Sequence, residues 1–246
     1  MIVQACLNGA RARNYHPALP VTPEMLARDA IACIMVGAAE IHMHPRRVDG
    51  RESLADDVIS PAVLAVRRAC PGTLIGLSTG AWIEGSLSAT TACIAGWRYK
   101  PDYASVNLSE DGAETVIRLL MDRGIGVEAG VSRQEDLDRL IALECADCVL
   151  RILVEIEDQD EAAARRQATA LLDRICRLPR AKPILLHGQD ATMWPLLAYA
   201  AANALSFRVG LEDGMYLRDG CLAANNAELV ADAVSLLNEI RHPRHD

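Results

Sequence analysis

Short apolar segments recur along the chain and predict eight β-strands. Each segment is rich in valine, isoleucine or leucine and gives way to glycine or polar residues where a strand would end. The predicted strands occupy residues 2–8, 39–44, 73–79, 103–108, 125–129, 148–155, 182–187 and 206–211. Their spacing of about 30 residues is typical of repeated βαβ units.

Longer amphipathic segments fill the intervals between these strands and predict helices. Thr22–Pro23 and Ser60–Pro61 each place a capping hydroxyl before a proline at the first helical position. Ser132 is followed three residues later by Glu135, the pattern of a capping box, and Gly124 ends another segment. The predicted helical segments are residues 22–38, 60–70, 111–124, 132–145, 159–177, 191–204 and 225–241.

Eight such units favour a closed barrel, whereas five or six would favour an open sheet. No Gly-x-Gly-x-x-Gly follows the first strand, which argues against a dinucleotide-binding fold. The chain also has no low-complexity segment or recognisable linker. We therefore predict a single (β/α)8 (TIM) barrel domain over residues 1–246.

Composition and charge narrow the range of partners and compartments. The formal net charge of -8 argues against nucleic acid and anionic membranes as partners, because both require a basic surface. The uncharged run at 191–207 is short for a membrane span and predicts a buried helix. The N-terminus has no signal-peptide pattern, and the eight cysteines are scattered, with Cys145-x-x-Cys148 lacking a second pair. We expect a reduced, cytoplasmic protein.

Two histidines at the end of the second predicted strand suggest a metal site. His42 and His44 are separated by one residue, so on a strand both side chains point to the same face. Glu212, after the eighth strand, could be a third ligand, because zinc binds imidazole and carboxylate and catalytic zinc keeps an open position. The alternative is a pair of histidines satisfied by hydrogen bonds, but the His-x-His spacing on a barrel strand favours a metal.

Other polar residues also lie at predicted strand ends, where barrel enzymes have their active sites. Arg208 is either a fixed positive charge beside the metal or the partner of Asp213 in a salt bridge. Residues 78–80, Ser-Thr-Gly, form either an ordinary turn or a carboxylate-binding loop. His187 is expected to support the ligands rather than to be one.

Three charged residues on the fifth and sixth predicted strands have a simpler interpretation. Glu128, Arg151 and Glu155 are expected to pair with one another inside the barrel wall.

Six segments of the chain together resemble the β-keto acid cleavage enzymes, whose founding activity is 3-keto-5-aminohexanoate cleavage. The pairing of GAAEIHMHPR with RVGLEDGMYL is the most specific part of the resemblance. The segments are LPVTPEMLARDA (19–30), GAAEIHMHPR (37–46), DGRESL (49–54), LSTGAW (77–82), RVGLEDGMYL (208–217) and NNAELVADA (225–233).

The resemblance implies a zinc-dependent barrel enzyme that condenses a β-keto acid with acetyl-CoA, giving acetoacetate and a new CoA thioester. It implies one catalytic Zn2+ per chain, held by His42, His44 and Glu212. It makes Arg208 and Asp213 the catalytic pair, without settling which group is the general base. The keto acid carboxylate would be held by Ser78, Thr79, Gly80 and Ser105, with Ser105 standing where the founding enzyme has threonine.

Two departures from the founding enzyme affect the expected substrates. Arg11 replaces a glutamate that reads the substrate's amino group, so we expect 3-keto-5-aminohexanoate to be a poor substrate. A dicarboxylic or oxygenated β-keto acid should be better, unless Arg11 points into solvent. The chain is also shorter than the founding type, which leaves acyl-CoA as co-substrate open.

Three other functions are compatible with parts of the pattern. A metal-dependent hydrolase would carry His-x-His on its first strand and more histidines on the fifth and sixth. A metal aldolase for sugar phosphates would need a glycine-rich cradle after the seventh and eighth strands. A ligand-binding barrel without chemistry is the third. In every case we expect a homo-oligomer, because barrel enzymes with apolar outer helices often assemble.

Overall fold

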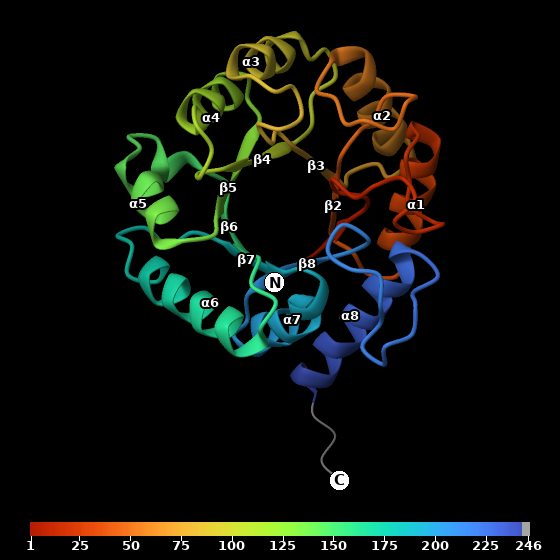
Figure 1. Ribbon diagram of the computed structural model, residues 1–246, viewed down its shortest axis with the longest axis vertical. Coiled ribbons are helices and arrows are strands. Elements are labelled where there is room, and N and C mark those ends of the chain that lie inside the picture. The colour runs from red at the N-terminus through yellow and green to blue at the C-terminus, as the bar shows by residue number, and fades with distance from the viewer. Residues whose placement is uncertain (243–246) are drawn as a thin grey trace.

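The computed structural model describes residues 1–242 and contains a closed barrel of parallel strands surrounded by helices (Figure 1). The strand order around the barrel is β1 to β8. The strands are β1 (Val3–Cys6), β2 (Glu40–Met43), β3 (Leu74–Ser78), β4 (Tyr103–Asn107), β5 (Gly126–Val131), β6 (Arg151–Ile156), β7 (Ile184–Gly188) and β8 (Ser206–Val209). The predicted (β/α)8 architecture is confirmed.

Helices follow the strands in alternation and form the outer ring (Figure 1). They are α1 (Pro23–Met35), α2 (Asp56–Ala69), α3 (Leu87–Gly96), α4 (Ala113–Asp122), α5 (Gln134–Ala142), α6 (Glu161–Ile175), α7 (Met193–Ala202) and α8 (Asn226–Arg241). The sequence patterns did not predict α3. Its segment LSATTACIAG consists largely of small and hydroxyl residues, and only Thr90 and Ile94 are buried, so it has almost no amphipathic signal.

One of the two predicted Ser/Thr–Pro helix starts is confirmed and the other is wrong. Thr22 caps α1 as predicted, because its hydroxyl accepts from the amide of Met25 at 3.3 Å. Ser60–Pro61 was wrong as a start: α2 begins at Asp56, and the Ser60 hydroxyl donates to the Asp56 carboxylate at 2.5 Å inside the helix. The aspartates of the first turn favour the positive end of the helix dipole, so the helix extends one turn further back.

The capping box of α5 was also predicted one position too early. The N-cap is Arg133, and Asp136 rather than Glu135 turns back to the backbone. The Asp136 carboxylate accepts from the amides of both Ser132 and Arg133 at 3.0 Å. The Asp136 carboxylate bonds the backbone as the expected Glu135 would, so the sequence pattern located the cap to within one residue but did not identify its members.

The uncharged run at 191–207 forms α7 and its flanks, and α7 is largely buried as expected. Among residues 1–242, none of the helices has the length and hydropathy needed to cross a membrane. All eight cysteines are free, and of these eight only Cys6, Cys33 and Cys70 are buried.

A charged network fills the barrel interior below the mouth. Arg151 donates through Nε to Glu128 Oε2 at 2.5 Å and also pairs with Glu40, while Gln4 bonds to both carboxylates. The expected pairing of Glu128 with Arg151 is therefore confirmed. Glu155 is the exception, because it lies higher in the barrel and pairs with His187 instead. Burying these charges is tolerable only because each has partners.

Candidate functional site

A cavity of about 330 Å³ lies at the C-terminal mouth of the barrel. Several of the residues predicted for the site line it, and they come from strands that are far apart in the sequence. These residues are Arg11, His42, His44, Ser78, Ser105, Arg208 and Glu212. Asp213, Thr79 and Gly80 are buried and are not among the lining residues. This end of the barrel is where the loops of such folds carry their chemistry.

Three possible metal ligands converge at one side of the cavity. His42 Nε2 lies 3.1 Å from His44 Nε2, and the Glu212 carboxylate lies 3.9 Å from the first and 3.5 Å from the second. One ligand atom from each residue lies within 4.8 Å of the others. Glu212 Oε2 is buried without a hydrogen-bond partner, which is costly unless a cation completes the site. Two imidazole nitrogens and a carboxylate are a donor set that suits zinc.

The barrel brings these ligands together through β1, which lies between β2 and β8. Cys6 pairs with His42 in register, and the Glu212 amide donates to the Cys6 carbonyl at 3.3 Å. Gly9 leaves room for the Glu212 side chain, because a Cβ there would lie only 2.3 Å from Glu212 Cγ. Gly9 also has a positive φ of 51°, which a side chain would disfavour.

His44 is fixed by Glu52 and Asn8, through contacts that the sequence patterns did not predict. Glu52 Oε1 lies 2.5 Å from His44 Nδ1, which turns Nε2 toward the ligand cluster. Asn8 accepts from the His44 amide at 2.8 Å and donates to its carbonyl at 2.9 Å. A carboxylate behind a ligating histidine fixes the ring tautomer and strengthens the ligand. Glu52 belongs to the segment DGRESL, whose spacing gives no indication of this contact.

The electrostatics of the cluster favour a positive charge at this point. Burial lowers the pKa of His42 well below its ordinary value. Burial also disfavours charged His44, but Glu212 and Glu52 outweigh it and raise the pKa of His44 to about 9. Burial would raise the pKa of Glu212, but Arg208 and the two histidines hold it well below its usual range. An ionised carboxylate and a favoured positive charge are what a cation site requires.

Arg208 links the Glu212 carboxylate to a second buried carboxylate, Asp213. Its side chain is buried, contacts the Glu212 carboxylate and donates to Asp213 Oδ1 through Nε at 3.2 Å and through a terminal nitrogen at 3.0 Å. Arg208 is therefore paired with Asp213, as one interpretation expected, and it also lines the cavity beside the possible metal ligands. The pairing holds the guanidinium in one position.

His187 lines the cavity beside this pair and is not one of the three possible ligands. Its Nδ1 lies 3.4 Å from Asp213 and its Nε2 lies 3.3 Å from Glu155. Burial and Arg208 lower the pKa of His187, but the bonds to Asp213 and Glu155 outweigh them and raise it to about 9. A protonated His187 would therefore balance the charge of Asp213.

Two hydroxyls face the cavity from β3 and β4. Ser78 and Ser105 are register neighbours, and the Ser78 oxygen accepts from the Gly80 amide at 3.2 Å. The Thr79 hydroxyl donates to the Ser105 carbonyl at 2.7 Å, so it is used within the sheet. A Cβ on Gly80 would lie 2.2 Å from the Trp82 ring, so Gly80 lets that indole cover the loop.

Arg11 lies at the cavity edge and does not point freely into solvent. Its Nε donates to the Glu212 carbonyl at 2.9 Å, and a terminal nitrogen pairs with Asp190 at 2.8 Å. The guanidinium also lies 4.4 Å from the centre of the Tyr15 ring. Asp190 offsets part of the Arg11 charge, and no local sequence pattern indicates this contact because the two residues are far apart in the chain.

Comparisons with solved structures show the fold. The apo structure of ObcA has a TM-score of 0.72 at 18% identity, over 89% of this chain and 61% of that chain. A ternary complex of ObcA with a C4-CoA adduct and oxalate has the same TM-score, over 90% of this chain and 64% of that chain. The 3-dehydroquinate dehydratase of Geobacillus kaustophilus HTA426 has a TM-score of 0.62 at 13% identity, over 99% of this chain and 92% of that one.

Sequence comparison gives a more specific result. Two curated relatives, from Fusobacterium nucleatum and Acetoanaerobium sticklandii, are each named 3-keto-5-aminohexanoate cleavage enzyme and are each 26% identical to this chain. The alignments cover 98% and 99% of this chain and 92% and 93% of the relatives. The family described as beta-keto acid cleavage enzyme matches residues 1–244. This chain therefore belongs to the β-keto acid cleavage enzyme family.

Proposed function

We propose that this chain, acting as one (β/α)8 domain, is a zinc-dependent β-keto acid cleavage enzyme that uses acetyl-CoA. The observation that carries the proposal is the convergence of His42, His44 and Glu212 at the barrel mouth beside the buried Arg208. Membership of the family supports the reaction class. The cytoplasmic location and the homo-oligomeric state stay predictions from the sequence.

The proposed reaction exchanges two acyl groups. The bond between C2 and C3 of the β-keto acid breaks, and the acyl group that contains C3 passes to the thiol of CoA. The acetyl group leaves the thioester and forms a new carbon–carbon bond to C2, giving acetoacetate. Zinc held by His42, His44 and Glu212 would supply a Lewis acid for the ketone and carboxylate oxygens of the keto acid.

The chain's own residues would bind the acid and stabilise its developing charge. The Ser78 and Ser105 hydroxyls face the cavity and can donate to the substrate carboxylate. Arg208 provides a fixed positive charge in a water-poor site, where such a charge stabilises a developing oxyanion most strongly. Asp213 is the positioning residue for Arg208. Thr79 and Gly80, which the resemblance places in the carboxylate loop, would support it, since the Thr79 hydroxyl donates to the Ser105 carbonyl and the Gly80 amide donates to the Ser78 hydroxyl.

A Schiff-base route finds no support in the lysines. The chain has only Lys100 and Lys182. Lys100 donates to the Arg123 carbonyl and Lys182 to the Asp147 carbonyl, and neither lines the cavity. The hydrolase alternative also lacks its expected residues, because β5 and β6 carry no histidine.

The proposal is tested by supplying the zinc-loaded protein with acetyl-CoA and a panel of β-keto acids. We expect acetoacetate and one new CoA thioester in equal amounts, and both should disappear after chelation and return when zinc is restored. If bound zinc is present and no acid in the panel yields acetoacetate, the proposed reaction is wrong. A hydrolysis product in its place would favour the hydrolase alternative.

The tail of the preferred acid is a separate prediction, based on Arg11. A cationic side chain at the cavity edge disfavours an ammonium group, even though Asp190 offsets part of its charge. We expect kcat/KM for 3-keto-5-aminohexanoate to be at least about tenfold lower than for an acid of equal length with a neutral or carboxylate tail, a modest free-energy difference. Arg11→Gln should reduce this difference in kcat/KM. A higher kcat/KM of the unaltered enzyme for 3-keto-5-aminohexanoate than for the other acids would contradict the prediction.

Glu52 provides a test of the metal site that leaves every proposed ligand in place. Glu52→Gln removes the charge behind His44 Nδ1, and we expect zinc affinity to fall about 10- to 100-fold, as is typical of such supporting groups. Competition with a chromogenic chelator measures the affinity. Glu135→Gln, at an exposed position on α5, is the matched control. Equal zinc affinity in the two variants would show that Glu52 does not support a metal ligand.

A further inference from the structure

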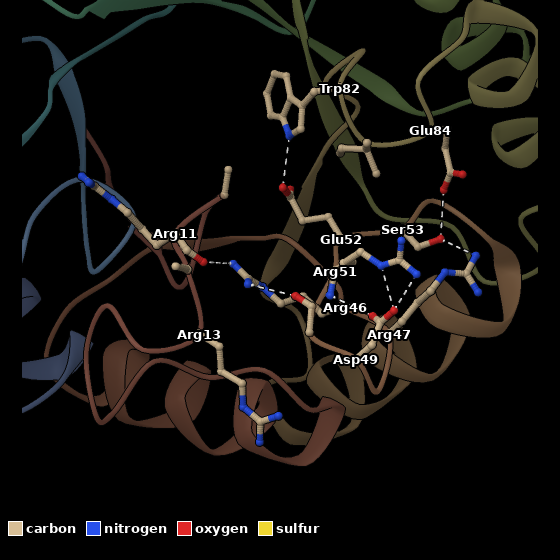
Figure 2. A pocket seen from close by; sticks show the side chains of 14 residues that line it. Arg11, Arg13, Arg46, Arg47, Asp49, Arg51, Glu52, Ser53, Trp82 and Glu84 are labelled. Atoms are coloured by element: carbon tan, nitrogen blue, oxygen red, sulfur yellow. Dashed lines mark hydrogen bonds and ion pairs between the residues drawn. The ribbon is translucent and has the colours of Figure 1, made fainter.

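A second and larger cavity, of about 580 Å³, adjoins the proposed active site. The two cavities share Ala10, Arg11 and Trp82 in their walls. Trp82 Nε1 donates to Glu52 Oε2 at 3.1 Å, and this contact stands at the edge of the second cavity (Figure 2). Glu52 lines the second cavity and also contacts the possible metal ligand His44. A ligand in the second cavity would therefore be separated from His44 by a single side chain.

The second cavity is lined by an unusual number of arginines for an acidic chain. We call it the arginine pocket; its cationic side chains are Arg11, Arg13, Arg46, Arg47 and Arg51, against three carboxylates, Asp49, Glu52 and Glu84. The walls thus carry a formal positive excess, although the whole chain has a net charge of -8. Such a local excess attracts anions and raises their local concentration.

Several of these charges have no carboxylate partner. Arg51 pairs with Asp49 at 2.8 Å, and Arg11 pairs with Asp190 outside the pocket. Among residues 1–242, Arg13, Arg46 and Arg47 have no carboxylate oxygen within salt-bridge distance. Figure 2 shows the Arg13, Arg46 and Arg47 side chains spread around the pocket.

The carboxylates in the walls are already engaged elsewhere. Glu52 bonds His44 and Trp82, and Glu84 accepts from the Ser53 hydroxyl at 2.9 Å and from the Leu54 amide at 2.6 Å. Among residues 1–242, they therefore form no ion pair with Arg13, Arg46 or Arg47.

One tight hairpin after β2 carries most of this pocket. Arg46 and Glu52 form an antiparallel bridge, and the Arg47 amide donates to the Arg51 carbonyl at 2.8 Å. Arg46 also donates to the carbonyls of Gly9 and Arg11, both at 2.7 Å, which ties the hairpin to the loop after β1. The same hairpin therefore presents guanidinium groups and holds the carboxylate that orients His44.

We infer that the arginine pocket binds the phosphate groups of the acyl-CoA co-substrate, an inference that rests on the proposed function. Guanidinium groups match phosphate oxygens with paired hydrogen bonds, and several together suit a ligand with several phosphates. The adjoining cavity then receives the thioester end of the same ligand. The small keto acid needs only the first cavity, which holds the Ser78 and Ser105 hydroxyls and Arg208.

Arg47 and Arg13 offer the sharpest test, because both are exposed and their removal should leave the fold intact. The variants Arg47→Ala and Arg13→Ala are compared with Arg68→Ala, an exposed arginine on α2 outside the pocket. Each is assayed with acetyl-CoA and with S-acetyl-N-acetylcysteamine, which has the thioester but no phosphate. Binding of coenzyme A alone is measured by calorimetry, without keto acid.

We expect KM for acetyl-CoA to rise about tenfold or more in Arg47→Ala and Arg13→Ala, since each loses charge-assisted hydrogen bonds. KM for the phosphate-free thioester and KM for the keto acid should stay unchanged in these variants. Arg68→Ala should have the same KM for acetyl-CoA as the unaltered enzyme. Coenzyme A affinity should fall in parallel, and it should fall less steeply with added salt in the variants than in the unaltered enzyme.

Other outcomes separate this inference from the proposed function. Unchanged KM for acetyl-CoA with normal acetoacetate production would overturn the inference and leave the function standing. A rise in KM for the keto acid instead would assign the pocket to an acidic substrate tail. Coenzyme A binding that depends on Arg47 without any acetoacetate production would keep the phosphate site and refute the reaction. Absence of coenzyme A binding would refute the phosphate site.

Discussion

Replacing His42 by alanine is expected to remove bound zinc and to lower kcat/KM by at least about a thousandfold. The metal would supply several kcal/mol of charge stabilisation, and each factor of ten corresponds to about 1.4 kcal/mol. His42 is fully buried beside His44 and Glu212, so few other groups could replace it as a ligand. Zinc content by elemental analysis and steady-state rates measure the two effects.

A fold defect must be separated from a metal defect in this variant. His42→Gln keeps more of the side-chain volume, and the melting temperature of the metal-free protein shows whether either variant folds. His242→Ala, at the end of α8 and away from the mouth, is the matched histidine control. A folded His42 variant that keeps stoichiometric zinc and full activity would remove His42 from the metal site.

Replacing Arg208 by alanine is expected to have the second-largest effect, with kcat falling about 100- to 1,000-fold, as when one oxyanion donor is removed. The change also leaves Asp213 and Glu212 as buried carboxylates without their main partner. Breaking such a pair from one side costs about 3–5 kcal/mol of unfolding free energy. Denaturant unfolding and rates at saturating substrate measure the two quantities.

Arg151→Ala is the matched control for this prediction. Arg151 is equally engaged with two carboxylates, Glu128 and Glu40, but lies below the cavity and does not line it. We expect a comparable loss of stability with a much smaller loss of kcat. Arg208→Lys should recover part of the stability but not the rate, because an ammonium group lacks the planar fork. Equal loss of kcat in Arg151→Ala and Arg208→Ala would reduce Arg208 to a structural residue.

The architecture could be predicted because it depends on short-range signals. Apolar segments at regular spacing marked all eight strands, and the same-face rule placed His42 and His44 together. The helix α3 was not predicted, because a stretch of small residues has no periodic apolar face. The start of α2 was misplaced because the Ser60–Pro61 pattern outweighed the aspartates one turn earlier.

The site was only partly predictable because its supporting contacts are tertiary. The Glu52–His44 contact depends on a hairpin that folds back over eight residues, and no local pattern reports that geometry. Asp190 reaches Arg11 from the far end of the chain and changes the charge that a substrate tail would meet. The arginine pocket has the same origin, since its charges gather only when the hairpin closes.

The most direct test of the central claim follows carbon atoms through the reaction. The zinc-loaded enzyme is given a β-keto acid and acetyl-CoA labelled with carbon-13 in both acetyl carbons, and the products are read by mass spectrometry and carbon NMR. We expect both labels in the ketone and methyl carbons of acetoacetate and an unlabelled new thioester. Label that stays in the thioester, or unlabelled acetoacetate, would contradict acyl exchange between the keto acid and acetyl-CoA.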